Sequence, residues 1–470
     1  MRYVVIGGGL SGLAAAFYLR RGVRDAEVIV CEASPRIGGL IQTEQVDQFL
    51  VEHGADMFSS EPDDALQLCQ DLGVADELIH PAREGRGAMI VRDNRLYTIP
   101  EGFVLMRPTR LTSMLTTPLL SVPGKLRLLR ERFVPQRKGS DDESVASFVR
   151  RRFGDELLTR IVQPLVGGIY TADPERLSMS ATMRPFVQME QQYGSLTAAT
   201  LARRRSGADS NEKSSSGARY SQFRGFAGGM KTLFQHLLNS LPDDCVRLSA
   251  PVLALARSAD RWRVVLSDSQ VIDDVDGIIL AVPTNVAAGI CRSISTSAAT
   301  ELEGFQSASS VILVVGAKDQ TIARIPSTFG FVVPARERRH ILACSFASHK
   351  FAGRTPPGHT LMRIFLGGAL QPEVCSWSDD RLFKVAAEEL GTWIGWNGRA
   401  VIKQVVRWND AMPQYCVGHL ERVAKVEACL REFPSLVVAG NGLYGVGIAP
   451  VVARAKRAAA QVAQATYGMS

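Results

Sequence analysis

Three glycines near the start of the chain are spaced so that their backbone could hold phosphate groups. Gly7, Gly9 and Gly12 follow a short apolar run at residues 3–6 and open an alanine-rich helical pattern at residues 13–20. The first glycine permits a tight turn, the second lets the backbone approach a pyrophosphate, and the third lets helix and strand pack closely. The helix N-terminus would then present free N–H groups and a partial positive charge to the phosphates.

An acidic residue, Glu32, follows the second apolar run, residues 27–31, and stands twenty positions after Gly12. A carboxylate at this place accepts hydrogen bonds from the ribose hydroxyls of an adenine nucleotide, and it disfavours the 2′-phosphate of NADP. A second glycine pair at residues 38–39 suits a bulky cofactor that lies flat against the backbone. FAD is therefore favoured over NAD. The alternative is a glycine-rich turn in an α/β protein without a ligand, which leaves Glu32 unexplained.

These residues need a βαβ unit to position them, in the order strand, glycine turn, helix, strand and acid. The same α/β character returns after residue 222, with strands predicted at 252–255, 262–266, 276–283 and 435–440 and a helix at 451–466. A second sheet is predicted between about 290 and 420, from strand patterns at 311–316, 328–334, 341–346 and 360–366. A hairpin is predicted at 88–100, mostly helix at 101–200, and exposed polar segments at 136–143 and 203–219.

Composition narrows the class of protein. A chain of 470 residues is too long for a single core, so two or three domains are expected. A net charge of +7 is too diffuse to indicate nucleic-acid binding. The eight cysteines are far apart and form no CxxC pair, so neither a metal site nor a disulfide framework is predicted. The apolar run at 436–453 is broken by glycines and a proline, and no membrane span is predicted.

Several strings further along the chain carry a resemblance to a known family. They lie at residues 161–170, 173–178, 190–196, 408–419 and 445–448. Together with the glycine loop they resemble the oxygen-dependent porphyrinogen oxidases of haem biosynthesis, within the amine-oxidase-like FAD superfamily. The strings follow the family's order over essentially the whole chain. The first and last motifs belong to the wider superfamily, and the middle ones are narrower.

The resemblance implies an α/β fold with an α+β substrate domain. A Rossmann-like FAD-binding domain would be assembled from three sequence segments, residues 1–60, 222–290 and 425–470. A mixed-sheet substrate-binding domain would comprise residues 61–100 and 291–424. An inserted helical domain would comprise residues 101–221.

The resemblance also implies the reaction. In this family FAD carries out three two-electron oxidations of a porphyrinogen to the aromatic porphyrin, and O₂ reoxidises the flavin and gives H₂O₂. The flavin performs the difficult step, while protein positions the ring and tunes its electrostatics. The sequence agrees in that no Ser/His/Asp or Cys/His constellation is visible, so no side chain is assigned as catalytic. His53 could act as a base, although a lone histidine is more often a structural hydrogen-bonding group.

Cofactor contacts are transferred from the family's motifs, position by position. From the first segment they are Gly7, Gly8, Gly9, Leu10, Ser11, Gly12, Glu32, Ala33, Arg36, Gly39 and Leu40. Near the flavin they are Gly54, Ala55, Asp56 and Met57, and Trp408, Val446, Gly447 and Ile448 would close over the ring. Val252 would pack near the adenine. Arg36 could instead be a solvated turn residue, and Val252 and Trp408 could simply fill the core.

Anionic propionates on the substrate call for cationic anchors. The family's eukaryotic members place an arginine at the start of the predicted hairpin, where this chain has Ala88. Arg86, Arg92 or Arg95 could replace it, although hairpin arginines are more often solvated. Both coproporphyrinogen III, with four propionates, and protoporphyrinogen IX, with two, fit the resemblance.

The helical domain touches the bilayer in membrane-associated members of the family. An interfacial helix would be formed by Leu111, Met114, Leu115, Leu119 and Leu120, flanked by Arg107, Arg110, Lys125 and Arg127. Packing inside the protein is the alternative. The expected location is cytoplasmic, with or without a peripheral contact to the inner face of the cell membrane, and a ferrochelatase is a candidate partner. Two rival functions remain: another flavin enzyme, acting on an amine or as a carotenoid desaturase, and a non-catalytic flavin-fold binding protein.

Overall fold

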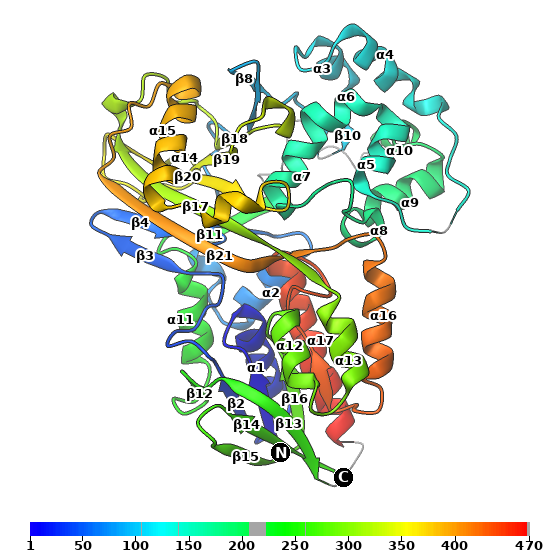
Figure 1. The fold of residues 1–470 in the computed structure, drawn as a ribbon, viewed down its shortest axis with the longest axis vertical. Coiled ribbons are helices and arrows are strands. Elements are labelled where there is room, and N and C mark those ends of the chain that lie inside the picture. The colour runs from blue at the N-terminus through cyan, green and yellow to red at the C-terminus, as the bar shows by residue number, and fades with distance from the viewer. Residues whose placement is uncertain (105, 140, 206–221, 259, 468–470) are drawn as a thin grey trace.

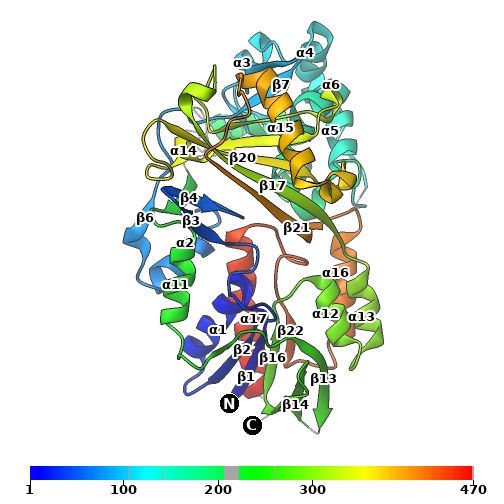
Figure 2. The same ribbon diagram turned by 60° about the vertical axis from the view of Figure 1, so that its left-hand side comes forward.

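The computed structural model describes residues 1–104, 106–139, 141–205, 222–258 and 260–467. Most of the predicted polar segment 203–219 therefore lies outside the described residues. Two sheets organise the molecule, and Figures 1 and 2 show the parallel one at the lower end and the long strands of the other crossing above it.

The parallel sheet has five strands in the order β12-β2-β1-β16-β22. They are β12 (Val246–Arg247), β2 (Glu27–Cys31), β1 (Arg2–Ile6), β16 (Gly277–Leu280) and β22 (Leu436–Val438). Strands that are covered on both faces are continuously apolar, which explains the unbroken runs in the sequence. Alternate residues of β1 point to opposite faces: Tyr3 and Val5 join one core, and Val4 and Ile6 join another.

Helices cover both faces of this sheet. On one face lie α1 (Leu10–Gly22), α11 (Lys231–Asn239), α17 (Ile448–Tyr467) and α2 (Asp64–Asp71). On the other lie α12 (Thr284–Cys291), α13 (Thr296–Glu303), α16 (His419–Cys429) and a three-stranded sheet of β13 (Val252–Ser258), β14 (Arg261–Leu266) and β15 (Val271–Val275). All five strands of the parallel sheet come from residues 1–60, 222–290 and 425–470, the three segments expected to form one domain. The domain boundaries themselves stay a prediction.

The second sheet has seven strands in the order β21-β17-β20-β19-β18-β7-β8. They are β21 (Ile402–Gln414), β17 (Gln306–Lys318), β20 (His359–Gly367), β19 (Ile341–Phe346), β18 (Gly330–Val332), β7 (Met89–Arg92) and β8 (Arg95–Thr98). Neighbours are antiparallel except β18 and β7, which run parallel. Helix α15 (Asp379–Ile394) packs on one face, and the hairpin of β3 (Thr43–Val46) and β4 (Phe49–Glu52) packs on the other. A mixed α/β fold with a separate second sheet is thus confirmed.

Helices between residues 111 and 205 form a third region with its own core. They are α3 (Leu111–Thr116), α4 (Val122–Leu129), α5 (Val145–Phe153), α6 (Asp155–Leu157), α7 (Gln163–Tyr170), α8 (Met179–Thr182), α9 (Arg184–Tyr193) and α10 (Leu196–Arg205), with the single turns η2 (Arg130–Phe133) and η3 (Leu158–Val162). Buried Arg152 pairs with Glu131 and Glu190 and ties α5, η2 and α9 together.

The remaining short elements connect these regions. They are β5 (Phe58–Ser59), β6 (Leu78–Ile79), β9 (Phe103–Val104), β10 (Arg107–Pro108), β11 (Phe223–Phe226), α14 (Ala347–Lys350) and the single turns η1 (Ala75–Glu77), η6 (Asp319–Thr321), η7 (Ala335–Glu337) and η8 (Pro372–Ser376).

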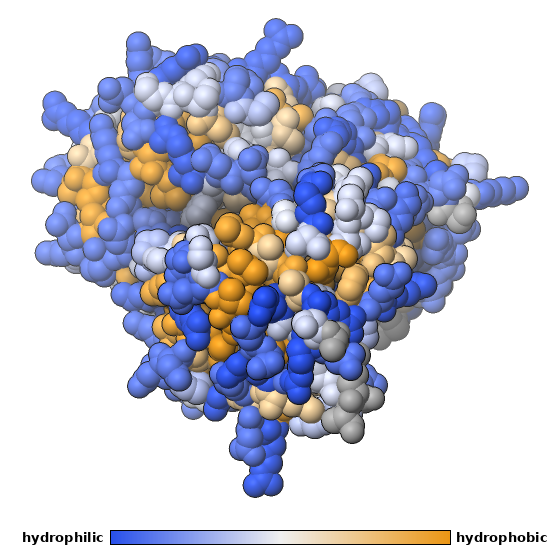
Figure 3. All heavy atoms as spheres, turned by 60° about the horizontal axis from the view of Figure 1, so that its bottom comes forward, coloured by the Kyte–Doolittle hydropathy of each residue, from blue (hydrophilic) through white to orange (hydrophobic). Residues whose placement is uncertain are grey.

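The prediction of an interfacial helix is wrong for most of the residues that were named for it and that the structure describes. Met114, Leu119 and Leu120 are buried in the core of the helical region, Arg107 is buried as well, and only Leu115 of the described apolar group is exposed. Across the described residues, every helix is too short or too polar to cross a bilayer. Figure 3 shows hydrophilic side chains around the rim of one face and apolar side chains gathered near its middle.

Candidate functional site

The glycine loop adopts a conformation that only glycine can hold. Gly7 has φ +110°, and a Cβ there would lie 2.5 Å from the Ala281 carbonyl oxygen. A Cβ on Gly12 would lie 1.8 Å from the Gly7 carbonyl oxygen, so helix α1 can begin this close to β1 only without a side chain. Gly9 caps α1 without a side-chain hydrogen bond, which leaves the first-turn N–H groups open to a ligand.

A second glycine segment lies directly against this loop. The Gly38 N–H donates to the Gly8 carbonyl at 2.9 Å, and a Cβ on Gly39 would lie 3.4 Å from the Gly9 Cα. Gly54 joins from the end of β4, since a Cβ there would lie 1.9 Å from the Leu40 carbonyl oxygen. Three segments separated in sequence thus expose bare backbone along one path, as a flat cofactor requires.

Glu32 lies beside the loop at the end of β2. Its Oε2 accepts from the Gly8 N–H at 2.6 Å, and its Oε1 accepts from the Ser34 N–H at 2.8 Å. These bonds aim the carboxylate across the mouth of the loop, where a ribose would lie. The Ala250 N–H donates to the Glu32 carbonyl at 2.9 Å, which brings Val252 to the same side. Val252 itself is buried in the core between the parallel sheet and β14.

Ser11, in the first turn of α1, has a buried hydroxyl with no hydrogen-bond partner among the residues that the structure describes. A buried polar atom without a partner is costly, so such an atom beside an open helix N-terminus fits a phosphate oxygen. Space is present as well, because a Cβ added at Gly9 would meet only Gly39, at 3.8 Å. The residues therefore fit a pyrophosphate-containing cofactor.

Of the other predicted contacts, Trp408 lies at the far end of the glycine path. The Trp408 Nε1–H donates to the His53 carbonyl at 2.9 Å and so fixes the residue before Gly54. His53 Nε2 lies 3.2 Å from Gln404 Oε1, as expected of a structural hydrogen-bonding group. The Gly445 N–H donates to the Tyr415 hydroxyl at 2.6 Å and holds the turn that leads into α17.

Within that turn, Val446 packs on the core of the helical region and Ile448 packs on the core under the parallel sheet. Residues 446–448 therefore lie where the two regions meet, and Gly447 between them is exposed. Ala33 and Ala55 are also exposed, while the Arg36 guanidinium donates to the Ile37 and Gly39 carbonyls at 3.1 and 3.0 Å.

Comparison with known proteins identifies the cofactor. Residues 10–463 match the model of the flavin containing amine oxidoreductase family. The chain belongs to this family. It is 31% identical to a coproporphyrinogen III oxidase of Bacillus subtilis (strain 168), over 97% of this chain and 96% of the relative, and 32% identical to a coproporphyrinogen III oxidase of Propionibacterium freudenreichii, over 98% and 90%. The relationship predicted from the sequence strings is confirmed.

A solved structure agrees with this assignment. A protein of Exiguobacterium sp. 255-15, provisionally described as a protoporphyrinogen oxidase, superimposes with a TM-score of 0.85 at 28% identity and 98% coverage of both chains. The chain is thus an oxidoreductase of amine-oxidase-like fold, and FAD is its cofactor. The individual contacts given above for the flavin site stay predictions that the geometry supports.

Three buried charged residues behind Gly54 form a cluster that the sequence predicts only in part. The Lys350 Nζ lies 2.8 Å and the Arg363 Nη1 lies 3.1 Å from the Asp56 Oδ2. Burial alone would raise the pKa of the Asp56 carboxyl, but the charges of Lys350 and Arg363 outweigh burial and hold that pKa below its ordinary value. Asp56 is among the residues predicted to lie near the flavin, whereas its two cationic partners are not.

The arginines predicted to anchor the substrate are not brought together. The Arg86 guanidinium donates to the Ala82 and Pro81 carbonyls at 2.9 and 3.1 Å, and Arg95 is exposed on β8. Arg92 instead lies with Arg160 and Arg336 around a small hollow at the edge between the helical region and β7. Arg160 has a buried Nε without a hydrogen-bond partner in the described part of the chain.

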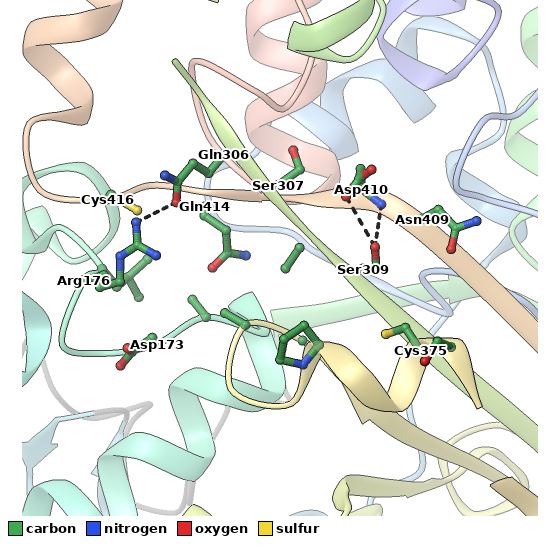
Figure 4. Close-up of a pocket in the computed structure, with 17 residues that line it drawn as sticks. Asp173, Arg176, Gln306, Ser307, Ser309, Cys375, Asn409, Asp410, Gln414 and Cys416 are labelled. Carbon is green, nitrogen blue, oxygen red and sulfur yellow. Dashed lines mark hydrogen bonds between the residues drawn. The ribbon is translucent and has the colours of Figure 1, made fainter. Parts of the chain in front are cut away.

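A cleft of about 510 Å³ opens elsewhere, between the helical region, the strands β17 and β21, and η8 (Figure 4). In its wall Arg176 Nη2 donates to Gln306 Oε1 at 2.6 Å, and the Asp410 N–H donates to Ser309 Oγ at 2.9 Å. Its lining residues differ from all those predicted to bind FAD. The cleft includes residues of the strings at 173–178 and 408–419, among them Asn409 directly after Trp408.

Proposed function

We propose that the chain oxidises a porphyrinogen to the corresponding porphyrin with O₂ as the electron acceptor. Each of three turns removes two electrons and two protons from the macrocycle, and one O₂ takes them up as one H₂O₂. The observation that carries this proposal is the near-complete alignment with two relatives named coproporphyrinogen III oxidase. The glycine path and the unpartnered Ser11 hydroxyl support it, because they fit the cofactor that such a reaction needs.

FAD supplies the two-electron chemistry when bound, and the residues of this chain bind and orient it. Backbone N–H groups in the first turn of α1 would hold the pyrophosphate, and Glu32 would hold the ribose of the adenosine. Gly39, Leu40 and Gly54 leave room for the cofactor along the path. Trp408 and residues 446–448 close the far end, where the substrate sheet, the helical region and the parallel sheet meet.

Coproporphyrinogen III is the substrate that we propose, with protoporphyrinogen IX as the alternative. The Bacillus and Propionibacterium relatives, both above 30% identity, carry the coproporphyrinogen name. Arg92, Arg160 and Arg336 are the candidate anchors for propionates, since guanidinium groups bind carboxylates with two parallel hydrogen bonds. Arg92 already pairs with Asp93 and Arg160 with Glu156, so propionates would compete with these carboxylates. Arg86 and Arg95 remain weaker candidates, because Arg86 is bonded to backbone carbonyls and Arg95 projects from the hairpin.

The test compares the two porphyrinogens side by side. Purified holoenzyme is mixed with each substrate in air, and porphyrin fluorescence and H₂O₂ are recorded. We expect fluorescence to rise with coproporphyrinogen III at least about tenfold faster, with three H₂O₂ formed per porphyrin and no porphyrin under argon. Oxidation of an amine or a carotenoid precursor, with neither porphyrinogen consumed, would contradict the proposal.

A peripheral contact with an anionic membrane surface is part of the proposal, but it lies further along the chain than the helix predicted for it. Val122, Leu126, Leu129 and Phe133 recur at helical spacing along α4 and η2, and all four are exposed. Lys125, Arg130 and Arg132 stand between them. Apolar side chains flanked by cations suit the boundary between acyl chains and anionic headgroups. A ferrochelatase, which would use the porphyrin product, remains a candidate partner.

A further inference from the structure

A buried cluster of charges lies behind the Gly54 end of the flavin site. Asp56, Lys350 and Arg363 are 8%, 7% and 3% exposed, so none of the three charges is solvated as a surface group would be. Lys350 comes from α14, Arg363 from β20 and Asp56 from the loop after β4. Charges this deeply buried are normally paired one to one, because each unpaired charge is costly.

The cluster carries an excess of positive charge. Arg354 is also buried, and it donates to the Phe226 and Ala227 carbonyls at 2.9 and 3.3 Å, so it brings a third cation that is bonded to the backbone. Glu52 is the other nearby carboxyl, and it accepts from the Met230 N–H at 2.8 Å and the Thr43 hydroxyl at 2.7 Å. Burial raises the pKa of Glu52 to about 7, so near neutral pH it is only partly charged. Among the described residues, three cations therefore face one full negative charge and part of a second.

Arg363 directs this excess toward the flavin site. Its Nη2 donates to the Gly54 carbonyl, and its buried Nε has no hydrogen-bond partner within the described part of the chain. Gly54 in turn lies against the Leu40 carbonyl, at the end of the glycine path that begins at Gly9. An unpartnered guanidinium N–H beside that path indicates that an electron-rich group belongs next to it.

We propose that Arg363, held by Asp56, is a positioning residue that fixes residues 54–57 and, together with Lys350, supplies positive potential to the flavin end of the site. The proposal rests on the predicted flavin contacts of residues 54–57. Two-electron reduction adds negative charge to the ring, so fixed positive charge nearby favours the reduced cofactor without any movement of the protein. The seven-stranded sheet thus contributes to the electronics of the cofactor as well as to the substrate site.

Two measurements that need no porphyrinogen test this role. The first is the midpoint potential of the bound flavin, and the second is the affinity of the oxidised holoenzyme for sulfite, an anion whose addition to flavin responds to the same positive potential. We expect R363M to lower the potential and weaken sulfite binding about tenfold, which for a two-electron couple corresponds to about 30 mV. R363K should keep a midpoint potential and a sulfite affinity close to those of wild type, because lysine retains the positive charge.

A change of sign separates electrostatics from mere structure. K350M should act in the same direction as R363M, whereas D56N should raise the potential and tighten sulfite binding, because it removes negative charge from the cluster. Loss of packing alone would not move D56N and K350M in opposite directions. Should R363M fail to fold, this pair still decides the matter.

The matched control is R407M. Arg407 lies in the same sheet, immediately before Trp408. It forms an ion pair at 2.7 Å with Asp379, the first residue of α15. We expect its flavin to keep wild-type potential and sulfite affinity. Wild-type values for R363M, or equal shifts in D56N and K350M, would overturn the proposal. If porphyrinogens proved not to be substrates while these shifts appeared, the inference would stand and the proposed reaction would not.

Discussion

Gly12 lies where helix α1 comes closest to the turn after β1, and any side chain there would collide with the backbone at 1.8 Å from the Gly7 carbonyl oxygen. G12A should therefore displace the loop that holds the pyrophosphate, at a cost of roughly 1–3 kcal/mol. We expect the purified variant to retain less than about a tenth of the wild-type FAD, measured by the ratio of flavin to protein absorbance.

The control for G12A is G22A, in the same helix, where nothing lies within 4 Å of the added Cβ. This variant should keep its flavin and unfold no earlier than wild type, because alanine favours a helix over glycine. A G12A protein with full flavin content would show that the loop is not the pyrophosphate site.

Glu52 makes stability depend on pH in an unusual direction. Burial raises the pKa of its carboxyl from 4.5 to about 7, so the folded protein holds this proton more tightly than the unfolded chain does. The contribution of Glu52 to the free energy of unfolding is fully present below pH 4.5 and is lost as the pH rises through about 7. It amounts to roughly 3 kcal/mol in all.

The test of this pH dependence is E52Q, which replaces the carboxyl with a neutral amide of the same shape. Urea unfolding is measured for both proteins between pH 5 and 8. We expect the free energy of unfolding of wild type to fall more steeply over this range than that of E52Q. Parallel curves for the two proteins would mean that Glu52 titrates normally.

The sequence predicts the glycine loop and its carboxylate, but it misses the two cations behind Gly54. The glycines and Glu32 are recognisable because their chemistry depends on spacing within about thirty residues of one βαβ unit. Arg363 and Lys350 reach the site only because β20 and α14 fold back beside β4, about 300 positions later in the chain. One signal was present, since Arg363 is a lone charge within the otherwise apolar run of residues 361–366.

At the scale of elements, α4 and η2 show why apolar spacing alone could not locate the membrane contact. Residues 111–120 have the same helical pattern as an interfacial helix, yet Met114, Leu119 and Leu120 are buried in the core of the helical region. The stripe from Val122 to Phe133 has no such cover, and its members are 41–80% exposed. Only the position of the neighbouring helices distinguishes the two cases.

The double variant L126E/F133E tests the membrane contact. Burying these two side chains would contribute roughly 1.5–3 kcal/mol each, so their replacement by carboxylates should reduce binding to anionic phospholipid vesicles at least about tenfold. Binding is measured by cosedimentation with the vesicles. We expect the wild-type protein to bind neutral vesicles more weakly than anionic ones. L253E, which alters an exposed leucine on β13, should bind as wild type does. An equal loss of vesicle binding in L126E/F133E and L253E would contradict a specific membrane-binding surface on α4 and η2.

At the scale of the whole molecule, the region predicted to bind FAD joins segments from both ends of the chain. Strand β1 pairs with β16, which pairs with β22, and α17 packs on α1 in one core. The seven-stranded sheet reaches this assembly through Trp408 and Arg363, which bond to the backbone at His53 and Gly54. We expect a ligand along the glycine path to bridge these segments, so that its binding stabilises them together.

We expect removal of FAD to lower the denaturant midpoint of the whole chain in a single transition. Restoring FAD at one hundred times its Kd should return about 2.7 kcal/mol of stability. FMN should restore much less, because it lacks the adenosine whose ribose Glu32 is placed to hold. E32Q should weaken FAD binding about tenfold or more, as expected for a lost hydrogen bond to a charged group, and leave FMN binding unchanged. Equal rescue by FMN and FAD, or equal loss of both in E32Q, would mean that the carboxylate does not hold the ribose.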